Sequence, residues 1–79
     1  MNNVDFIKKY GKLEFYMICK DISQDLAVAK VTGKIGGYKI NKRQKNVKFY
    51  RNNKHSLCLD FATIFTLGID KLSDYIERG

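Results

Sequence analysis

Short segments in which apolar and polar residues alternate fill the middle of the chain, and turn-forming sequences separate them. NVKFYR and HSLCL alternate in this way, and YKIN precedes them. Alternation with a period of two places the apolar side chains on one face of a β-strand. The intervening KRQK and Asn52-Asn53 sequences favour tight reversals of the chain. Residues 38–59 therefore predict consecutive antiparallel strands.

The preceding part of the chain extends this pattern. KLEFYMICK places Leu13, Phe15, Met17 and Cys19 at every second position, which predicts a strand over residues 13–20. The Gly36-Gly37 pair suits a two-residue hairpin loop after the segment LAVAKVTGKI. Residues 23–32 have two interpretations, because SQDLAVAK also fits a helix that begins after Ser23 and ends at Gly33.

Both ends of the chain have helical patterns. Asn2 or Asn3 can cap a short helix that stops at Gly11. After Asp60, which can cap a further helix, apolar residues recur every three or four positions. Gly68 can divide this last part in two. We therefore expect one α+β domain over residues 1–79. Its antiparallel meander has four to five strands, a short N-terminal helix and one or two C-terminal helices packed on one face.

Loop lengths predict how the strands pair. The KRQK loop sets Lys39 opposite Lys48, and a three-residue loop over residues 52–54 sets Phe49 opposite Leu57. A hairpin at Gly36-Gly37 would set Lys34 opposite Lys39. Apolar residues then gather on one face as the core, which the C-terminal helices must cover. The other face is basic and carries two tyrosines.

Positive charge is concentrated in one part of the sequence. The net charge is +7, but residues 26–59 contain nine Lys or Arg and no Asp or Glu. Most solvated surfaces mix both signs, so a block of one sign indicates a polarised surface. Nucleic acid, an anionic membrane and an acidic protein are the usual partners of such a surface.

A lysine-rich sheet face with tyrosines favours nucleic-acid binding. Lysines hold phosphates as point charges and read bases poorly, so we expect little sequence specificity, with DNA or RNA as ligand and some preference for single strands. The predicted contact residues are Tyr16, Lys30, Lys34, Lys39, Lys42, Arg43, Lys45, Lys48, Tyr50, Arg51 and Lys54.

A second function class fits the same sequence. A small phage or mobile-element protein could use its basic face to bind and inhibit a host protein, such as a nucleic-acid-processing enzyme, as anti-CRISPR proteins do. An acidic protein is then the partner. We expect no enzyme activity, cofactor or metal site, because His55 lacks catalytic partners at an interpretable spacing and the chain offers too few ligands.

Other features set the expected location and assembly. No apolar run is long enough for a membrane span and the N-terminus lacks a secretion signal, so we predict a cytoplasmic protein without membrane contact. Cys19 and Cys58 are predicted to be buried free thiols. HSLCL is an edge strand with little charge, and edge pairing could form a homodimer.

Two resemblances accompany this interpretation. The tail LGIDKLSDYIERG resembles the second half of a phage-repressor helix-turn-helix, although it is one residue short and its net charge is negative. The predicted order of strands followed by an amphipathic helix is similar to that of Pur-alpha repeats and Whirly proteins. Those families bind single-stranded nucleic acid on their sheets, which implies the same use of a sheet here.

Overall fold

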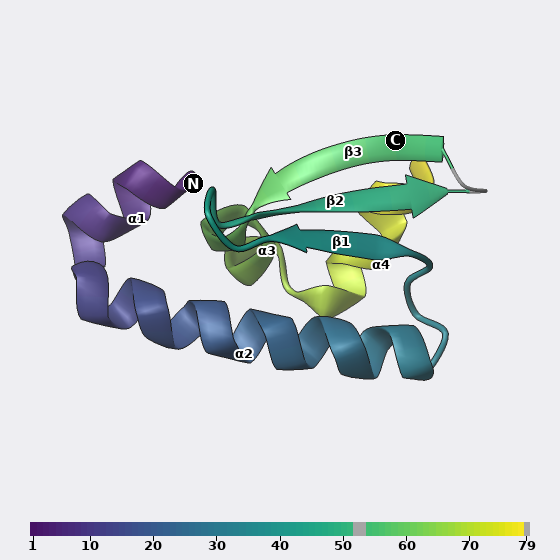
Figure 1. The fold of residues 1–79 in the computed structure, drawn as a ribbon, viewed down its shortest axis with the longest axis horizontal. Helices are drawn as coiled ribbons and strands as arrows, with labels where there is room; N and C mark the ends of the chain where they lie inside the picture. Colours follow the sequence, from purple (N-terminus) through teal and green to yellow (C-terminus); the bar gives the residue numbers. More distant parts are fainter. Residues whose placement is uncertain (52–53, 79) are drawn as a thin grey trace.

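The computed structural model describes residues 1–51 and 54–78. Within these residues, two helices precede a three-stranded antiparallel sheet and two helices follow it (Figure 1). The predicted α+β class with an antiparallel sheet is confirmed, but the predicted four to five strands are three. The elements are α1 (Asn3–Tyr10), α2 (Lys12–Val31), β1 (Tyr38–Asn41), β2 (Asn46–Arg51), β3 (Lys54–Asp60), α3 (Phe61–Leu67) and α4 (Ile69–Arg78).

Helix α2 replaces the strands predicted before Gly36. It runs without a break through residues 13–20 and 23–32, so the strand prediction for 13–20 is wrong and the helical interpretation of 23–32 is correct up to Val31. Leu13 and Met17, predicted to be in the core, are 74% and 54% exposed. The buried residues of α2 follow helical spacing instead: Phe15, Ile18, Cys19, Ile22, Leu26 and Ala29.

The end of α2 explains why no hairpin forms at Gly36-Gly37. Gly33 has φ +79°, and its N–H donates to the carbonyl of Lys30 while that of Lys34 donates to the carbonyl of Ala29. These two bonds form a Schellman motif, which ends a helix and turns the chain away. Residues 34–37 then lead into β1, so Lys34 does not pair with Lys39. Ile35 is buried, but it belongs to this connection.

The sheet has the predicted register over most of its length. Lys39 lies opposite Lys48, Val47 opposite Leu59 and Phe49 opposite Leu57. An irregularity after Phe49 then sets Arg51 opposite Lys54, so Lys54 belongs to β3 and not to the predicted three-residue loop. The predicted Asn52-Asn53 turn lies outside the described residues.

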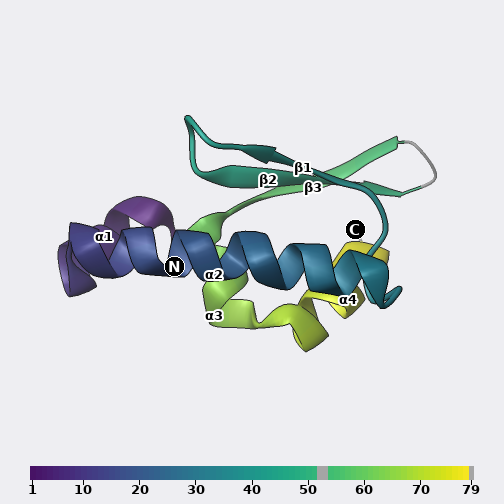
Figure 2. The same ribbon diagram turned by 60° about the horizontal axis from the view of Figure 1, so that its bottom comes forward.

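All of the helices lie on one side of the sheet (Figure 2). Val47 and Phe49 point into this side and are 0% and 1% exposed. Together with the buried residues of α2 and with Phe61 and Ile64 of α3, they form the hydrophobic core. The opposite side remains open to solvent, as Figure 2 shows. The C-terminal helices α3 and α4 contact this apolar face, but the predicted helix arrangement is not matched, because the long helix α2 also packs there.

Asn3 ties the N-terminus to the end of β3. Asn2 is the N-cap of α1, as predicted, and its side chain accepts a hydrogen bond from the N–H of Asp5. Asn3 accepts a hydrogen bond from the N–H of Ala62 at 3.0 Å, and its own N–H donates to Oδ2 of Asp60 at 3.2 Å. The Asn3 side chain therefore caps α3. Asp60 occupies the N-cap position but makes no side-chain capping bond.

The C-terminal helices contradict the helix-turn-helix resemblance. Only Gly68, with φ +81°, separates α3 from α4, whereas a helix-turn-helix joins its helices by a turn of about three or four residues. Leu72 and Ile76 of α4 are buried in the core. The element order, with two helices before the sheet, also differs from the order that suggested Pur-alpha and Whirly proteins.

Candidate nucleic-acid interface

The open side of the sheet carries the central lysines of the predicted site. Lys39 of β1 and Lys48 of β2 are exposed and directly opposite one another. We use the name outer sheet face for the residues on this side: Lys39, Asn41, Asn46, Lys48, Tyr50 and Cys58. A hollow of about 410 Å³ lies here, lined by Lys39, Ile40, Asn41, Lys42, Lys48 and Tyr50.

The turn between β1 and β2 adds three cations beside this face. Lys42 and Arg43 are exposed and Lys45 is partly buried. Oδ1 of Asn41 accepts hydrogen bonds from the N–H groups of Arg43 and Gln44, at 3.1 and 3.0 Å. Such an Asx turn fixes the local backbone. We call Lys42, Arg43 and Lys45 the basic turn.

The rest of the molecule also holds the basic turn in place. The carbonyl of Lys45 accepts hydrogen bonds from the N–H of Phe61 at 3.1 Å and from Nδ2 of Asn3 at 2.9 Å. These bonds connect the turn to α3 and α1, which lie far from it in the sequence. The backbone under the lysines is therefore ordered before a ligand binds, which reduces the entropy lost on binding.

The far end of the sheet continues the positive charge. Arg51 and Lys54 are exposed and pair across β2 and β3 at the opposite end from the basic turn. Lys45, Lys48 and Arg51 thus span the length of β2, about 20 Å at the usual strand rise. The only acidic residue in the three strands is Asp60, whose Oδ2 accepts the hydrogen bond from Asn3.

Three predicted contact residues lie away from the outer sheet face, because they belong to α2 or follow it. Nζ of Lys34 donates to Oδ1 of Asp70 at 2.8 Å, which ties the end of α2 to α4. This hydrogen bond and the charge of Lys34 lower the pKa of Asp70. Nζ of Lys30 lies 5.8 Å from the ring centroid of Tyr38, a cation–π contact on the helical side of the sheet.

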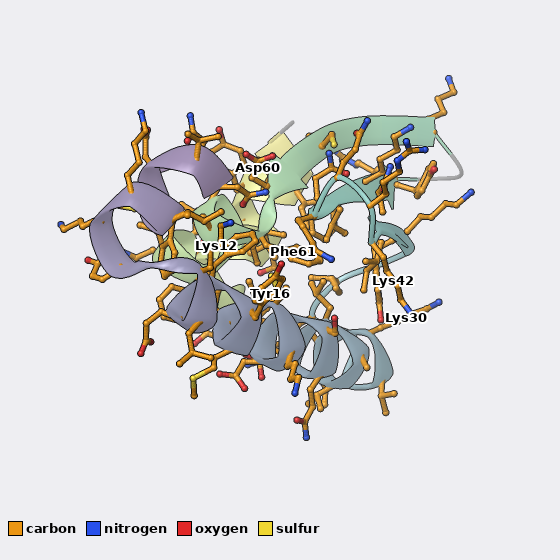
Figure 3. The ribbon with its side chains drawn as sticks, turned by 60° about the vertical axis from the view of Figure 1, so that its left-hand side comes forward. Lys12, Tyr16, Lys30, Lys42, Asp60 and Phe61 are labelled. Carbon is orange, nitrogen blue, oxygen red and sulfur yellow. The ribbon has the colours of Figure 1, made fainter. Side chains whose placement is uncertain are left out.

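Tyr16 is the third residue that the strand prediction misplaced. It is on α2 and points toward Phe61 at the start of α3 (Figure 3). A second hollow, of about 330 Å³, lies between α2 and the basic turn. Its lining includes Lys20, which sequence analysis did not select. The lining residues are Tyr16, Cys19, Lys20, Ser23, Ile40, Lys42, Lys45 and Phe61.

The two cysteines differ in environment. Cys19 is buried, and desolvation raises the pKa of its thiol, an effect that the nearby charge of Lys45 partly opposes. The thiol is therefore neutral near pH 7 and a weak nucleophile. Cys58 is exposed on the outer sheet face, so the prediction that both thiols are buried holds for Cys19 alone.

Comparison with known proteins assigns no family. No protein-family model matches the chain, and neither the curated proteins nor the solved structures gave a match. In the part of the chain that the structure describes, no helix combines the length and apolar character needed to cross a membrane.

Proposed function

We propose that this protein binds nucleic acid on the outer sheet face and the basic turn, with little sequence specificity. The observation that carries the proposal is Lys39 lying directly opposite Lys48, with Lys42 at the same hollow. Like charges that face each other across strands destabilise a sheet. A phosphate backbone over this face removes the repulsion and releases its own condensed counterions.

Each group has a distinct part in binding. The ammonium groups of Lys39 and Lys48 neutralise phosphates over the middle of the sheet, while the basic turn and the Arg51–Lys54 end extend contact along β2. Tyr50 lines the same hollow and offers a ring for base stacking. Lysine predominates, so most contacts position the backbone and few read base edges.

A charge-reversal experiment tests the proposal. The double variant Lys39→Glu with Lys48→Glu should abolish binding of a short fluorescent oligonucleotide measured by anisotropy at low salt. The matched control is Lys8→Glu with Lys71→Glu, which has the same net charge but changes exposed residues of α1 and α4. Circular dichroism checks that both variants fold. For the native protein, log Kd should rise linearly with log salt, by about 0.7 per phosphate contact for a single strand.

Two results would contradict the proposal. One is equal binding by the two double variants, which would leave only a non-specific effect of net charge. The other is a lysate pull-down that retains one protein after nuclease treatment, with no oligonucleotide binding at low salt. That result would favour the alternative function, in which the protein binds and inhibits a host protein.

The homodimer predicted from pairing of the HSLCL edge remains a prediction. In the structure, β3 is an edge strand of the sheet.

A further inference from the structure

The two hollows described above meet at the edge of the sheet. β1 is an edge strand, and Ile40 and Lys42 line both the hollow on the outer sheet face and the one against α2. A ligand that follows the surface from Lys48 past Lys42 therefore reaches the second hollow without leaving the protein. We call this second hollow the α2 hollow.

The α2 hollow combines an apolar floor with a cationic rim. Phe61 and Cys19 are buried and Ile40 is partly buried, so they form the floor. Lys20 lies one helical turn after Tyr16, and Lys42 and Lys45 approach from the basic turn. Tyr16 is 55% exposed and forms an aromatic wall. The lining thus places ammonium groups around a surface suited to a flat, weakly polar ring.

This combination matches the chemistry of a nucleotide. A base has two flat faces that stack on aromatic rings, and the phosphates on either side of it carry negative charge. At about 330 Å³ the hollow is near the lower end of the range for ligand sites, roughly 300–1,000 Å³. One base suits that size. A duplex keeps its bases stacked and paired inside the helix, so it cannot offer one without unstacking it.

We infer that the α2 hollow takes one unpaired base of a bound strand, stacked on Tyr16, while the backbone crosses the β1 edge at Lys42. This inference rests on the proposed function and adds single-strand selectivity to it. Lys20 and Lys45 hold the phosphates beside the inserted base. The buried thiol of Cys19 is neutral, so the floor adds no negative charge that would repel them.

The first test compares a single strand with a duplex. Tyr16→Ala should weaken binding of oligothymidylate roughly 5- to 150-fold and leave duplex binding unchanged. Tyr16→Phe keeps the ring and should bind oligothymidylate as the native protein does. Tyr75→Ala is the matched control, because Tyr75 is similarly exposed, at 51%, but lies on α4. Lys20→Ala should lower the slope of log Kd against log salt by about 0.7 for the single strand and leave it unchanged for the duplex.

A second measurement uses the native protein and does not depend on a variant folding. An oligothymidylate that contains iodouracil is photocrosslinked, and the adduct is located by mass spectrometry of peptides. We expect the adduct on Tyr16. An adduct confined to Tyr50 would overturn the inference, because the base would then lie on the outer sheet face.

The outcomes separate this inference from the proposed function. If Lys39→Glu with Lys48→Glu abolishes binding but Tyr16→Ala affects neither ligand, or both equally, the inference fails and the proposed function stands. If the native protein binds neither oligothymidylate nor the duplex at low salt, both fail. A third outcome is that the native protein binds thymidine monophosphate but not oligothymidylate, and that Tyr16→Ala abolishes this binding. The α2 hollow would then be a site for a free nucleotide, and the inference would be overturned.

Discussion

Gly33 and Gly68 lie where α2 and α3 end, and Gly33 and the nearby Gly36 make a matched test. Gly33 has φ +79° and open space around its Cβ position, so Gly33→Ala adds only backbone strain, about 1–2 kcal/mol. Gly36 lacks such a φ, and an added Cβ would meet the carbonyl oxygen of Tyr50 at an ordinary 3.6 Å. Urea unfolding should show Gly33→Ala destabilised and Gly36→Ala unchanged or more stable by up to about 1 kcal/mol. Equal loss in both variants would contradict the role assigned to the Schellman turn.

The glycines that end α1 and α3 were predicted correctly, but the side chain that caps α3 was not. Gly11 and Gly68 were expected to end helices, and both have positive φ at helix ends. Asp60 was expected to cap the helix that follows it, but the side chain of Asn3 does so from the other end of the chain. A local sequence pattern indicates that a helix begins at a residue. It cannot identify a capping group that tertiary packing brings from 59 positions away.

Helix α2 shows how two periodicities can share one sequence. Phe15 and Cys19 are four residues apart, so they lie on one face both in a strand and in a helix. Leu13 and Met17 have the same spacing. A strand would place them on the same face as Phe15 and Cys19, whereas in the helix they are exposed. The sequence does favour a long helix in one respect, because residues 12–32 contain neither Gly nor Pro. The KRQK turn between β1 and β2 is short, which is why the register of that hairpin was predictable.

The docking of α4 should depend on its apolar face and little on its ion pair. Leu72 is 0% exposed, and Leu72→Ala should lower the free energy of unfolding by about 2–5 kcal/mol. Asp70→Asn removes the negative charge of the ion pair with Lys34, which joins two exposed side chains that solvent screens. The change that Asp70→Asn makes in the free energy of unfolding at pH 7 should be small and should disappear in high salt. Chemical denaturation of both variants checks this, and a larger loss for Asp70→Asn would contradict it.

The same ion pair gives a pH dependence of known sign. The pKa of Asp70 is lowered by the hydrogen bond and charge of Lys34, so folding favours the ionised carboxyl. The contribution of Asp70 is therefore complete above the ordinary aspartate pKa of about 3.9 and is lost as the pH falls through its lowered value. Chemical denaturation at several pH values checks this. The difference in free energy of unfolding between the native protein and Asp70→Asn should be constant above the ordinary aspartate pKa and should shrink as the pH falls below it.

Across the whole molecule, the predicted contact residues divide between the sheet with its basic turn and α2 with the segment that follows it. Lys39, Lys48 and Tyr50 lie on one face of the sheet, as the register of the β1–β2 hairpin predicted, and in the structure they line one hollow. Tyr16, Lys30 and Lys34 were placed there through strands that do not exist. The structure moves Tyr16 to the α2 hollow and adds Lys20, which a helical interpretation of residues 13–20 would have placed one turn beyond Tyr16.

The arrangement of the two thiols allows the bound surface to be mapped in the intact protein. Cys58 is exposed and lies opposite Lys48 on the outer sheet face, while Cys19 is buried with a raised thiol pKa. Iodoacetamide should therefore alkylate Cys58 first. A saturating oligonucleotide should slow alkylation of Cys58, and added salt should restore the rate as the nucleic acid dissociates. Peptide mass spectrometry separates alkylation of Cys58 from that of Cys19 in the native protein, so the rate at Cys58 is measured without a cysteine variant. An unchanged rate at saturation would place the ligand elsewhere, because a strand held by Lys39 and Lys48 has to pass beside Cys58.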